Sequence, residues 1–131
     1  MADVETALYT ILSGDAGVTA LISTRMYPVV IPQDVSLPAV AYQRISTARV
    51  YSHDGPSCLA RPRFQFSCTA TTYSAARAVA NAIRAALDGY NDTANGVRIM
   101  AAFTQNEFDG FTDTDDLWTV YQDYFVWHVE S

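Results

Sequence analysis

Residues 63–70 alternate between apolar and polar side chains, and the segment that follows changes to a helical pattern. The apolar set is Phe64, Phe66, Cys68 and Ala70, and the polar set is Arg63, Gln65, Ser67 and Thr69. A period of two places the two sets on opposite faces of a β-strand. One face should therefore meet a helix, and the other should meet water or a neighbouring molecule.

The covering helix is predicted immediately downstream. Thr72 is a suitable N-cap and Gly89 a suitable stop, and the positions between them that share one face are Ala76, Val79, Ala80, Ile83 and Leu87. A second amphipathic helix is expected in the first dozen residues, with Asp3 as N-cap and Gly14 at its end. Asp15 could cap a further short turn of helix.

Four more segments have the composition of strands: Arg25–Ile31, Leu37–Ser46, Gly96–Thr104 and Leu117–Glu130. Pro28 favours an edge position or a bend for the first of these. The last has bulky residues on both faces, which predicts a central strand or one covered by another subunit. Together the elements predict an α+β fold, with an antiparallel sheet of about four to five strands and two main helices packed on one face.

Two connections complete this scheme. Residues 47–60 are expected to form a long loop held by the turn signal Asp54-Gly55-Pro56. Residues 105–116 are expected to form an acidic loop exposed to solvent. The spacing of Asp113, Asp115 and Asp116 has a superficial likeness to a calcium loop, but the glycine and the terminal glutamate of that motif are missing.

Composition limits the class of protein. The 131 residues fit a single domain, 1–131, which is long enough to bury a core without disulfides or metal. The formal net charge is −6 and all eight basic residues are arginine, so the surface should repel DNA on average. The sequence shows no charged leader and no apolar run long enough to span a bilayer, which predicts a protein that stays in the cytosol where it is made. The two cysteines, Cys58 and Cys68, are expected as free thiols.

No motif in the chain points to catalysis. His53 and Asp54 lie beside Ser52, Ser57 and Cys58, which are the residue types of a nucleophile with its base, but no nucleophile elbow or oxyanion hole accompanies them. The cysteines and histidines lack metal-ligand spacing, and phosphate-binding glycine loops are absent from the sequence. We therefore expect no enzyme activity, no metal site and no cofactor.

Several pieces of sequence occur in a characteristic order: Glu5–Leu12, Arg25–Pro28, Leu37–Arg44, Tyr51–Ser57, Arg61–Phe66 and Thr72–Ala78. This order resembles the tail-terminator, or tail-completion, family of long-tailed phages and gene transfer agents. The resemblance covers most of the chain. It implies a structural virion protein that assembles as a hexameric ring on the head-proximal end of the tail tube. Such a ring ends tube polymerisation and joins the tail to the head-side connector.

The partners implied by the resemblance are further copies of the chain, the major tail tube protein and the head-side connector or stopper protein. DNA would pass through the lumen without specific binding, which an acidic protein suits. The expected location is the tail or neck of the virion, after synthesis in the cytoplasm of the host bacterium. No membrane is implied.

Two segments, Tyr51–Leu59 and Glu107–Asp116, are candidates for the subunit contacts. Aromatic residues surrounded by polar residues are typical of protein interfaces. The candidate residues in or beside these segments are Tyr51, His53, Asp54, Phe108, Asp109, Phe111, Asp113 and Asp115. The arginines Arg44, Arg61 and Arg63 are expected to pair with those acids between subunits, since planar guanidinium groups suit such sites. The alternative is that Phe108 and Phe111 fold back onto the core of their own domain.

Three other functions stay open on the sequence alone. The chain could be another neck adaptor of the same virion, or a soluble binding module that acts as a monomer or dimer. A hydrolase built on His53 and Asp54 is a third. A tube subunit is disfavoured because the sequence shows no long β-hairpin arm.

Overall fold

The computed structural model describes residues 4–23, 25–32, 35–52, 55–94, 96–112 and 117–129, without the side chains of 49–52, 55–58 and 112. Within these ranges the chain forms three helices and six strands. The helices are α1 (Val4–Ser13), α2 (Ala16–Ile22) and α3 (Tyr73–Leu87). The strands are β1 (Met26–Pro28), β2 (Ala39–Ser52), β3 (Gly55–Ala70), β4 (Asp92–Ala94), β5 (Val97–Thr112) and β6 (Leu117–Val129).

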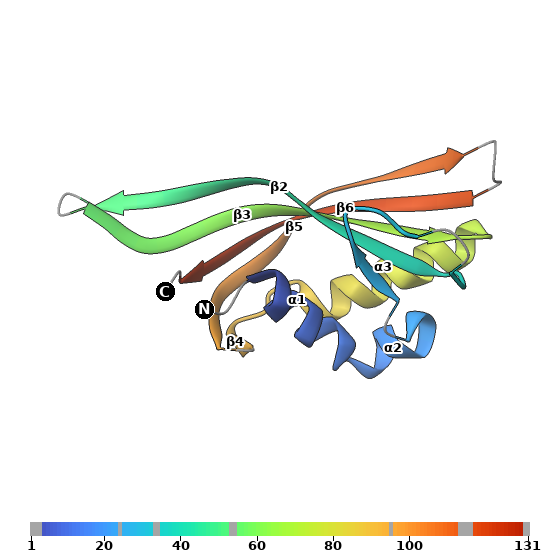
Figure 1. The fold of residues 1–131 in the computed structure, drawn as a ribbon, viewed down its shortest axis with the longest axis horizontal. Coiled ribbons are helices and arrows are strands. Elements are labelled where there is room, and N and C mark those ends of the chain that lie inside the picture. Colours follow the sequence, from blue (N-terminus) through green and yellow to red (C-terminus); the bar gives the residue numbers. More distant parts are fainter. Residues whose placement is uncertain are drawn as a thin grey trace.

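The strands form one curled sheet in the order β1-β2-β3-β6-β5-β4, with the helices on one side of it (Figure 1). The predicted α+β class is correct, but the sheet has more strands than expected and is mixed, because β1 pairs in parallel with β2. β4 has only three residues and pairs with β5 at Val97–Ile99, too short a segment to show a period in the sequence. The prediction that the last strand is central is confirmed, since β6 lies between β3 and β5.

The helices form where the sequence places caps and apolar stripes. The Val18 N–H donates to Asp15 Oδ1 at 3.1 Å at the start of α2, and the Ala75 N–H donates to Thr72 Oγ1 at 3.2 Å at the start of α3. The stripe predicted for α3 is buried at every position. Asp3, the expected cap of α1, lies outside the described residues.

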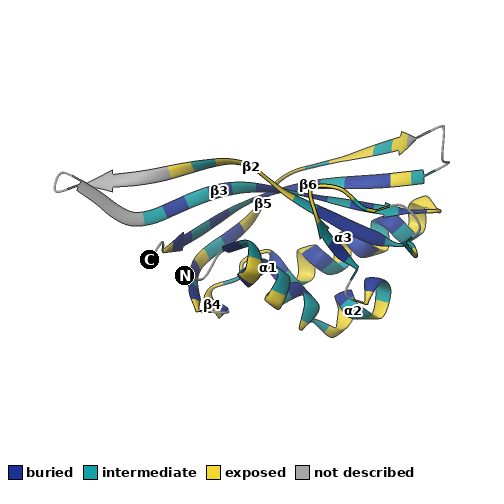
Figure 2. Cartoon of the chain, viewed as in Figure 1, coloured by how far each residue is buried: buried dark blue, intermediate teal, exposed yellow. Residues whose placement is uncertain are grey.

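The core lies between the helices and the facing side of β3, β5 and β6 (Figure 2). Its fully buried large side chains include Leu8, Leu12, Val18, Ile22, Phe64, Phe66, Ile83, Leu87, Ile99 and Tyr124. The rings of Phe66 and Tyr124 meet edge to face, with their centroids 5.5 Å apart. Burial of each such side chain stabilises the fold by about 1.5–3 kcal/mol, so this one layer holds the sheet and helices together.

The two predicted loops are wrong. β2 continues to Ser52 and β3 begins at Gly55, and the two pair antiparallel as far as these residues in a long hairpin, which extends to one side beyond the helices in Figure 1. β5 likewise continues through residue 112 and pairs with β6 as far as Thr112 and Leu117. In both segments, pairing with a partner strand holds the backbone in an extended conformation. The polar composition of the segments does not reveal this pairing. The chain therefore has the long hairpin that the sequence analysis had counted as missing.

Irregularities in the strand ladders shape the sheet. The β3–β6 ladder has no pairs at Arg61 and Pro62, where proline has no N–H to donate. Register shifts interrupt β2 between Arg44 and Ser46 and β5 between Thr104 and Asn106. Such bulges increase the local twist of a strand, consistent with the curl of the sheet in Figure 1.

The end of α3 covers part of the outer edge of β5. The Gly89 N–H donates to the Ala102 carbonyl oxygen at 2.7 Å, and the Thr104 N–H donates to Asp88 Oδ1 at 3.0 Å. Gly89 has a φ of +80°, which glycine adopts without strain. None of the helices in the described ranges is long and apolar enough to span a membrane.

Candidate interaction surfaces

One face of the sheet is left without helices, and we call it the open face. Its members come from alternating positions of three strands: Arg61, Arg63 and Gln65 on β3, Phe103 and Phe108 on β5, and Tyr121, Asp123, Phe125 and Trp127 on β6. Cross-strand pairs such as Phe103 with Phe125 and Phe108 with Tyr121 hold the face together. The aromatic residues of β6 lie on both of its faces, so period alone does not separate this face from the core face.

An ion pair with a buried carboxylate and a partly exposed arginine lies in the middle of the open face. Arg63 forms a salt bridge with Asp123, whose side chain is fully buried, and Gln65 donates to Asp123 Oδ1 at 3.1 Å. Asp123 is the strand partner of Gln65, and Arg63 is one position further along the same face. The salt bridge and the second hydrogen bond offset the cost of burying the Asp123 carboxylate. They also fix β3 and β6 in register.

Beside this pair, Arg61 lies on two aromatic rings. Its guanidinium carbon is 4.4 Å from the centroid of Phe125 and 5.4 Å from that of Trp127. Among the described residues its buried Nε has no hydrogen-bond acceptor, and no carboxylate lies within ion-pair distance of it. Arg61 thus differs from Arg63 in lacking an acidic partner among those residues.

An apolar hollow of about 410 Å³ opens at the same end of the open face. It is lined by Leu59, Met100, Ala101, Phe103 and Trp127, and we call it the open-face pocket. Phe103 and Met100 are 52% and 44% exposed, so the pocket and its rim together form an exposed apolar patch. The sequence analysis did not select any residue of this pocket.

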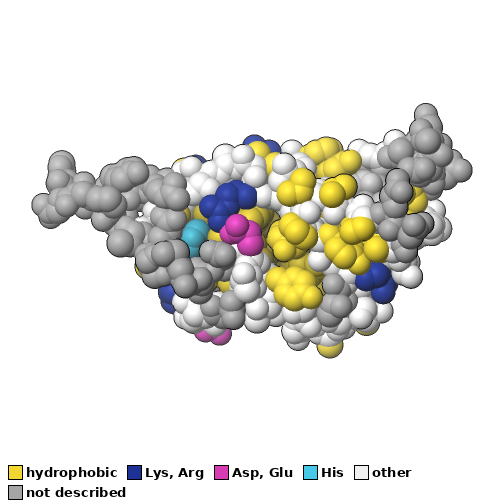
Figure 3. All heavy atoms as spheres, in the orientation of Figure 1, with side chains coloured by type: hydrophobic (Ala, Val, Ile, Leu, Met, Phe, Trp, Pro, Cys, Tyr) yellow, Lys and Arg dark blue, Asp and Glu magenta, His cyan; other side chains and the backbone are white. Residues whose placement is uncertain are grey.

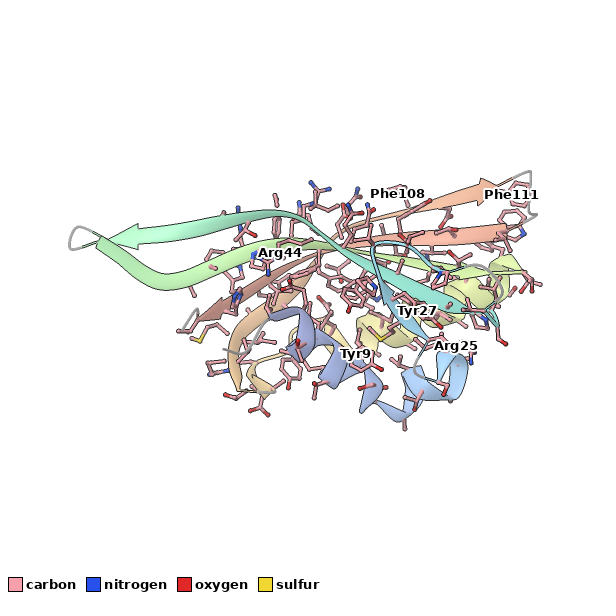
Figure 4. The ribbon with its side chains drawn as sticks, in the orientation of Figure 1. Tyr9, Arg25, Tyr27, Arg44, Phe108 and Phe111 are labelled. Atoms are coloured by element: carbon pink, nitrogen blue, oxygen red, sulfur yellow. The ribbon has the colours of Figure 1, made fainter. Side chains whose placement is uncertain are left out.

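Exposed aromatic residues also mark the other end of the sheet, where β5 ends and β6 begins. Phe111 and Trp118 are 46% and 36% exposed with centroids 4.5 Å apart, and Tyr73 of α3 meets Trp118 at 5.6 Å. Figure 4 places Phe111 at the end of β5, with Phe108 further back along the same strand. Phe111 and Trp118 lie on the helix side of the sheet, because Trp118 pairs with buried Ala70.

Phe108 stacks on Tyr121 on the open face, with centroids 4.8 Å apart and rings inclined by 17°. Gly110 makes room for this stack, since a Cβ at that position would meet the Tyr121 ring at 2.9 Å. Phe108 is 45% exposed. Phe108 and Phe111 are therefore both on a strand, in place of the predicted loop, and both keep much of their surface in solvent.

The acids of β5 have partners in their own chain. Glu107 forms an ion pair with Arg77 of α3 and accepts from Gln122 Nε2 at 3.1 Å. Burial acts to raise the pKa of Glu107, but the hydrogen bonds from Gln122 and Arg77 outweigh it and hold that pKa below its ordinary value. Asp109 accepts from the Tyr73 hydroxyl at 3.0 Å and lies 3.8 Å from Arg77.

The Gln122 side chain extends this network into the core. It is fully buried, its Nε2 also donates to the Ala80 carbonyl oxygen at 2.9 Å, and its Oε1 accepts from the Tyr124 hydroxyl at 3.2 Å. Each polar group of Gln122 therefore has a partner, and the network ties α3 to β5 and β6.

The remaining arginine candidate, Arg44, also has a partner in its own chain. It forms a salt bridge with Glu5 of α1 and lies 5.5 Å from the centroid of Phe64. Figure 4 shows Arg44 on β2, and Figure 3 shows a basic and an acidic group beside hydrophobic side chains that gather on the visible face. Pairing of Arg44 or Arg63 with a neighbouring subunit would have to replace these contacts, and such pairing stays a prediction.

The other predicted interface residues cannot be placed by their side chains. Tyr51 lies in β2 as backbone only, and His53, Asp54, Asp113 and Asp115 lie outside the described residues.

A turn after β1 is a further exposed feature that the sequence analysis missed. Val29 has a φ of +67°, a conformation that costs a β-branched residue backbone strain. The Val29 N–H donates to the Tyr42 carbonyl oxygen at 2.8 Å, and the Val30 N–H to that of Pro28 at 2.7 Å. Val29 and Val30 are 64% and 68% exposed. The predicted strand therefore ends at Pro28, three residues early.

Cys68 is a free and fully buried thiol, as predicted, and burial raises its pKa well above the ordinary value. The side chain of Cys58 is outside the described part of the chain. Among the described residues no group of three or more histidine, cysteine or acidic side chains could hold a metal ion.

Exposed aromatic side chains on a rigid sheet are the features of a protein that binds other proteins. Residues 6–128 match the family model described as Tail completion protein gp17, and the chain therefore belongs to that family. It is a structural component of the virion tail and not an enzyme, as the sequence analysis predicted. No curated protein matches the chain.

The fold is also similar to that of a chain in a solved structure described as "Virion of native gene transfer agent (GTA) particle". The TM-score is 0.82 at 21% sequence identity, over 96% of this chain and 94% of that chain. At this identity the likeness shows a shared fold.

Proposed function

We propose that this protein forms a hexameric ring at the head-proximal end of the tail tube, ends tube polymerisation there and joins the tail to the head-side connector. The observation that carries the proposal is the match to the tail-completion family over residues 6–128. A closed ring built from one subunit needs two different surfaces that meet head to tail. The chain offers separate exposed apolar surfaces at the two ends of its sheet and at the β1 turn.

The partners in this proposal are copies of the chain, the tail tube protein and the head-side connector or stopper protein. DNA passes through the lumen without specific binding. The charge of −6 supports this, as do the ion pairs that occupy Arg44, Arg63 and Arg77. The candidate interface residues named from the sequence remain part of the proposal.

A tube subunit is the second candidate, and the hairpin of β2 and β3 favours it, since the expected absence of such an arm had been the argument against it. A neck adaptor is the third. The three roles differ in what they do to a growing tube. A terminator stops growth at one end, a tube subunit is incorporated along the length, and an adaptor leaves growth unchanged.

The test is to add purified protein to polymerising tail tube subunits over a range of ratios and to measure tube lengths by electron microscopy. Tubes that shorten as the ratio rises, with the protein at one end and a mass near six subunits, support the proposal. Tubes of unchanged length, or tubes labelled throughout, refute it. Light scattering of the free protein over a concentration series shows whether the ring forms before it meets a tube.

A further inference from the structure

Each outer edge of the sheet has an exposed length of strand. On β2 it is Gln43–Ala48, which we call the β2 stretch, and all of its residues except half-buried Thr47 are exposed. On β5 it is Gln105–Gly110, which we call the β5 stretch, and its residues are exposed or half-buried. The outer side of a strand presents N–H and C=O groups that can pair with a strand of another molecule.

Covered parts of the same two edges lie directly before the stretches. β1 covers β2 as far as Tyr42, whose carbonyl oxygen accepts from the Val29 N–H. The end of α3 covers β5 as far as Thr104, whose N–H donates to Asp88. In an antiparallel pair of the two stretches, these covered parts lie beyond opposite ends of the pair. A six-residue pair therefore fits between them.

The directions of the strands allow this pairing between copies. β2, β3, β6 and β5 are neighbours that alternate in direction, so β2 and β5 of one chain run antiparallel. Rotation about a ring axis keeps these directions. When two sheets meet edge to edge in a ring, β5 of one copy is thus antiparallel to β2 of the next, which is the more stable kind of pair.

The faces of the strands and their charges select a register. Arg44 contacts α1 and Asp109 contacts α3, so both side chains lie on the helix side of the sheet. With Arg44 opposite Asp109, the register shift after Arg44 places Ala48 opposite Asn106, and opposed side chains lie on the same face throughout. Opposite charges directly across two strands stabilise the pair.

The two charged side chains are free to make this contact. Arg44 is 33% exposed and Asp109 is 49% exposed, so the guanidinium can turn from Glu5 to the Asp109 of a neighbouring copy. Neither stretch offers the same complement to its own kind, because the β2 stretch carries only the basic charge of Arg44 and the β5 stretch only the acidic charges of Glu107 and Asp109.

The same register gives a sheet that can close. Within one chain Arg44 is level with Thr104, through Phe64 and Tyr124. Pairing with Asp109 instead moves each copy along the strands by about four residues, counted across the register shift after Thr104, or about 13 Å. The strands β2, β3, β6 and β5 span about 19 Å at the spacing of a sheet. An offset of about 13 Å over about 19 Å tilts the strands by about 35°, as in closed sheets.

We propose that the β2 stretch of one copy pairs with the β5 stretch of the next, with Arg44 opposite Asp109, so that the sheets of all copies join edge to edge. The contact is heterologous, so a series of copies can close into a ring. This inference rests on the proposed ring and names the strands that build it. Beyond Gly110 the pairing also brings Phe111 beside the β1 turn of the neighbouring copy, where Val29 is exposed.

A disulfide designed between the two stretches tests the register. Residues directly opposite in an antiparallel pair have Cα atoms about 4.5–5.5 Å apart, within the range of about 4.4–6.8 Å that a disulfide spans. The variant is Ala48→Cys with Asn106→Cys in a Cys58→Ser background, and Cys68 is buried. Both new positions are exposed, and circular dichroism with thermal unfolding checks that the protein is folded.

The matched control is Ser46→Cys with Asn106→Cys in the same background. Its two positions would be diagonal neighbours about 7–8 Å apart, too far for a disulfide. Each single variant, Ala48→Cys or Asn106→Cys, reports pairing of identical strands. Rings formed in solution or on tail tubes are oxidised and separated by denaturing electrophoresis. We expect the Ala48→Cys, Asn106→Cys variant to give a covalent ladder up to the ring size, with about tenfold less product from the controls.

A charge reversal tests the ion pair separately. Asp109→Arg places a like charge opposite Arg44, and it should weaken association by about tenfold in sedimentation experiments. Asp92→Arg makes the same change on β4, outside the paired stretches, and should leave association unchanged. Equal weakening by both variants would mean that net charge decides association, and the Arg44–Asp109 pair would be wrong.

Other outcomes overturn the inference in distinguishable ways. If rings form and neither double variant is cross-linked, edge pairing is wrong and the ring proposal stands. A ladder from Ser46→Cys with Asn106→Cys would show a different register, and dimers of a single variant would show pairing of identical edges. If Asp109→Arg rings form normally but no longer bind tubes, the edge serves the tube protein. If wild type stays monomeric both in solution and on tubes, the proposed ring itself is refuted.

Discussion

The network around Gln122 gives a quantitative prediction for the substitution Gln122→Leu, which keeps a similar volume but removes the amide. The Tyr124 hydroxyl then loses its acceptor in a fully buried site, at a cost of about 1–3 kcal/mol. Glu107 loses the hydrogen bond that Gln122 donates to its charged carboxylate. This bond is worth about 1–2 kcal/mol, because the Glu107 carboxylate is partly exposed. With some gain from the added apolar surface, the substitution should lower the free energy of unfolding by about 3 kcal/mol.

The double variant Gln122→Leu with Tyr124→Phe separates these contributions. Removal of the hydroxyl leaves no unpaired group at Tyr124, so the double variant should be about 1–2 kcal/mol more stable than Gln122→Leu alone. The assay is urea unfolding at pH 7, followed by the fluorescence of Trp118 and Trp127. A loss below about 1 kcal/mol for Gln122→Leu, or a double variant less stable than the single one, would refute the argument.

The pH dependence supplies a second check on the same variant. The pKa of Glu107 is lowered in the folded protein, so its contribution is complete above the unfolded pKa of about 4.3 and is lost as the pH falls through the folded pKa. Gln122→Leu removes one of the hydrogen bonds that lower this pKa. The stability difference between wild type and variant should therefore shrink below about pH 4, and a difference that grows there contradicts the assignment.

Three further predictions concern single positions. Gly110→Ala should displace the Tyr121 ring and lower stability by about 1–3 kcal/mol, measured by urea unfolding; an unchanged midpoint would show that the ring moves at no cost. Thr72→Ala should cost about 1 kcal/mol through loss of the cap on the Ala75 N–H, whereas Thr72→Ser should retain most of it, and equal losses would contradict a capping role. Cys68 in a Cys58→Ser variant should react with a thiol reagent only when the protein is unfolded in urea, because the raised pKa and burial leave no accessible thiolate; rapid labelling of this variant in native buffer would exclude the buried position.

Local sequence signals predicted the elements that depend on local causes. The strand through Phe64 and Phe66, the α3 cap at Thr72 and the α2 cap at Asp15 follow from period and capping chemistry, and the structure confirms each. The central place of β6 also followed from its two bulky faces.

The errors lie where pairing between distant residues decides the structure. Polar composition suggested loops at residues 47–60 and 105–116, yet residues 47–52, 55–60 and 105–112 are strands because a partner strand holds their backbones. Phe108 and Phe111 were correctly selected as aromatics on an exposed segment, but the strand carrying them was not foreseen. The open-face pocket joins residues from β3, β5 and β6, so no window of sequence contains it.

The capped edge of β5 bears on how the free protein behaves at high concentration. An uncovered edge strand can pair with the same strand of another molecule, a common route to aggregation. Here β4 closes the edge at Val97–Ile99, and Asp88 and Gly89 close it at Ala102 and Thr104. On this edge of β5 the described stretch from Gln105 to Thr112 is not closed in this way, and it carries Glu107 and Asp109, whose like charges would oppose each other in a pair of identical strands. The covered edge thus limits sheet growth along β5, and the proposed ring, which has a fixed number of copies, requires such a limit.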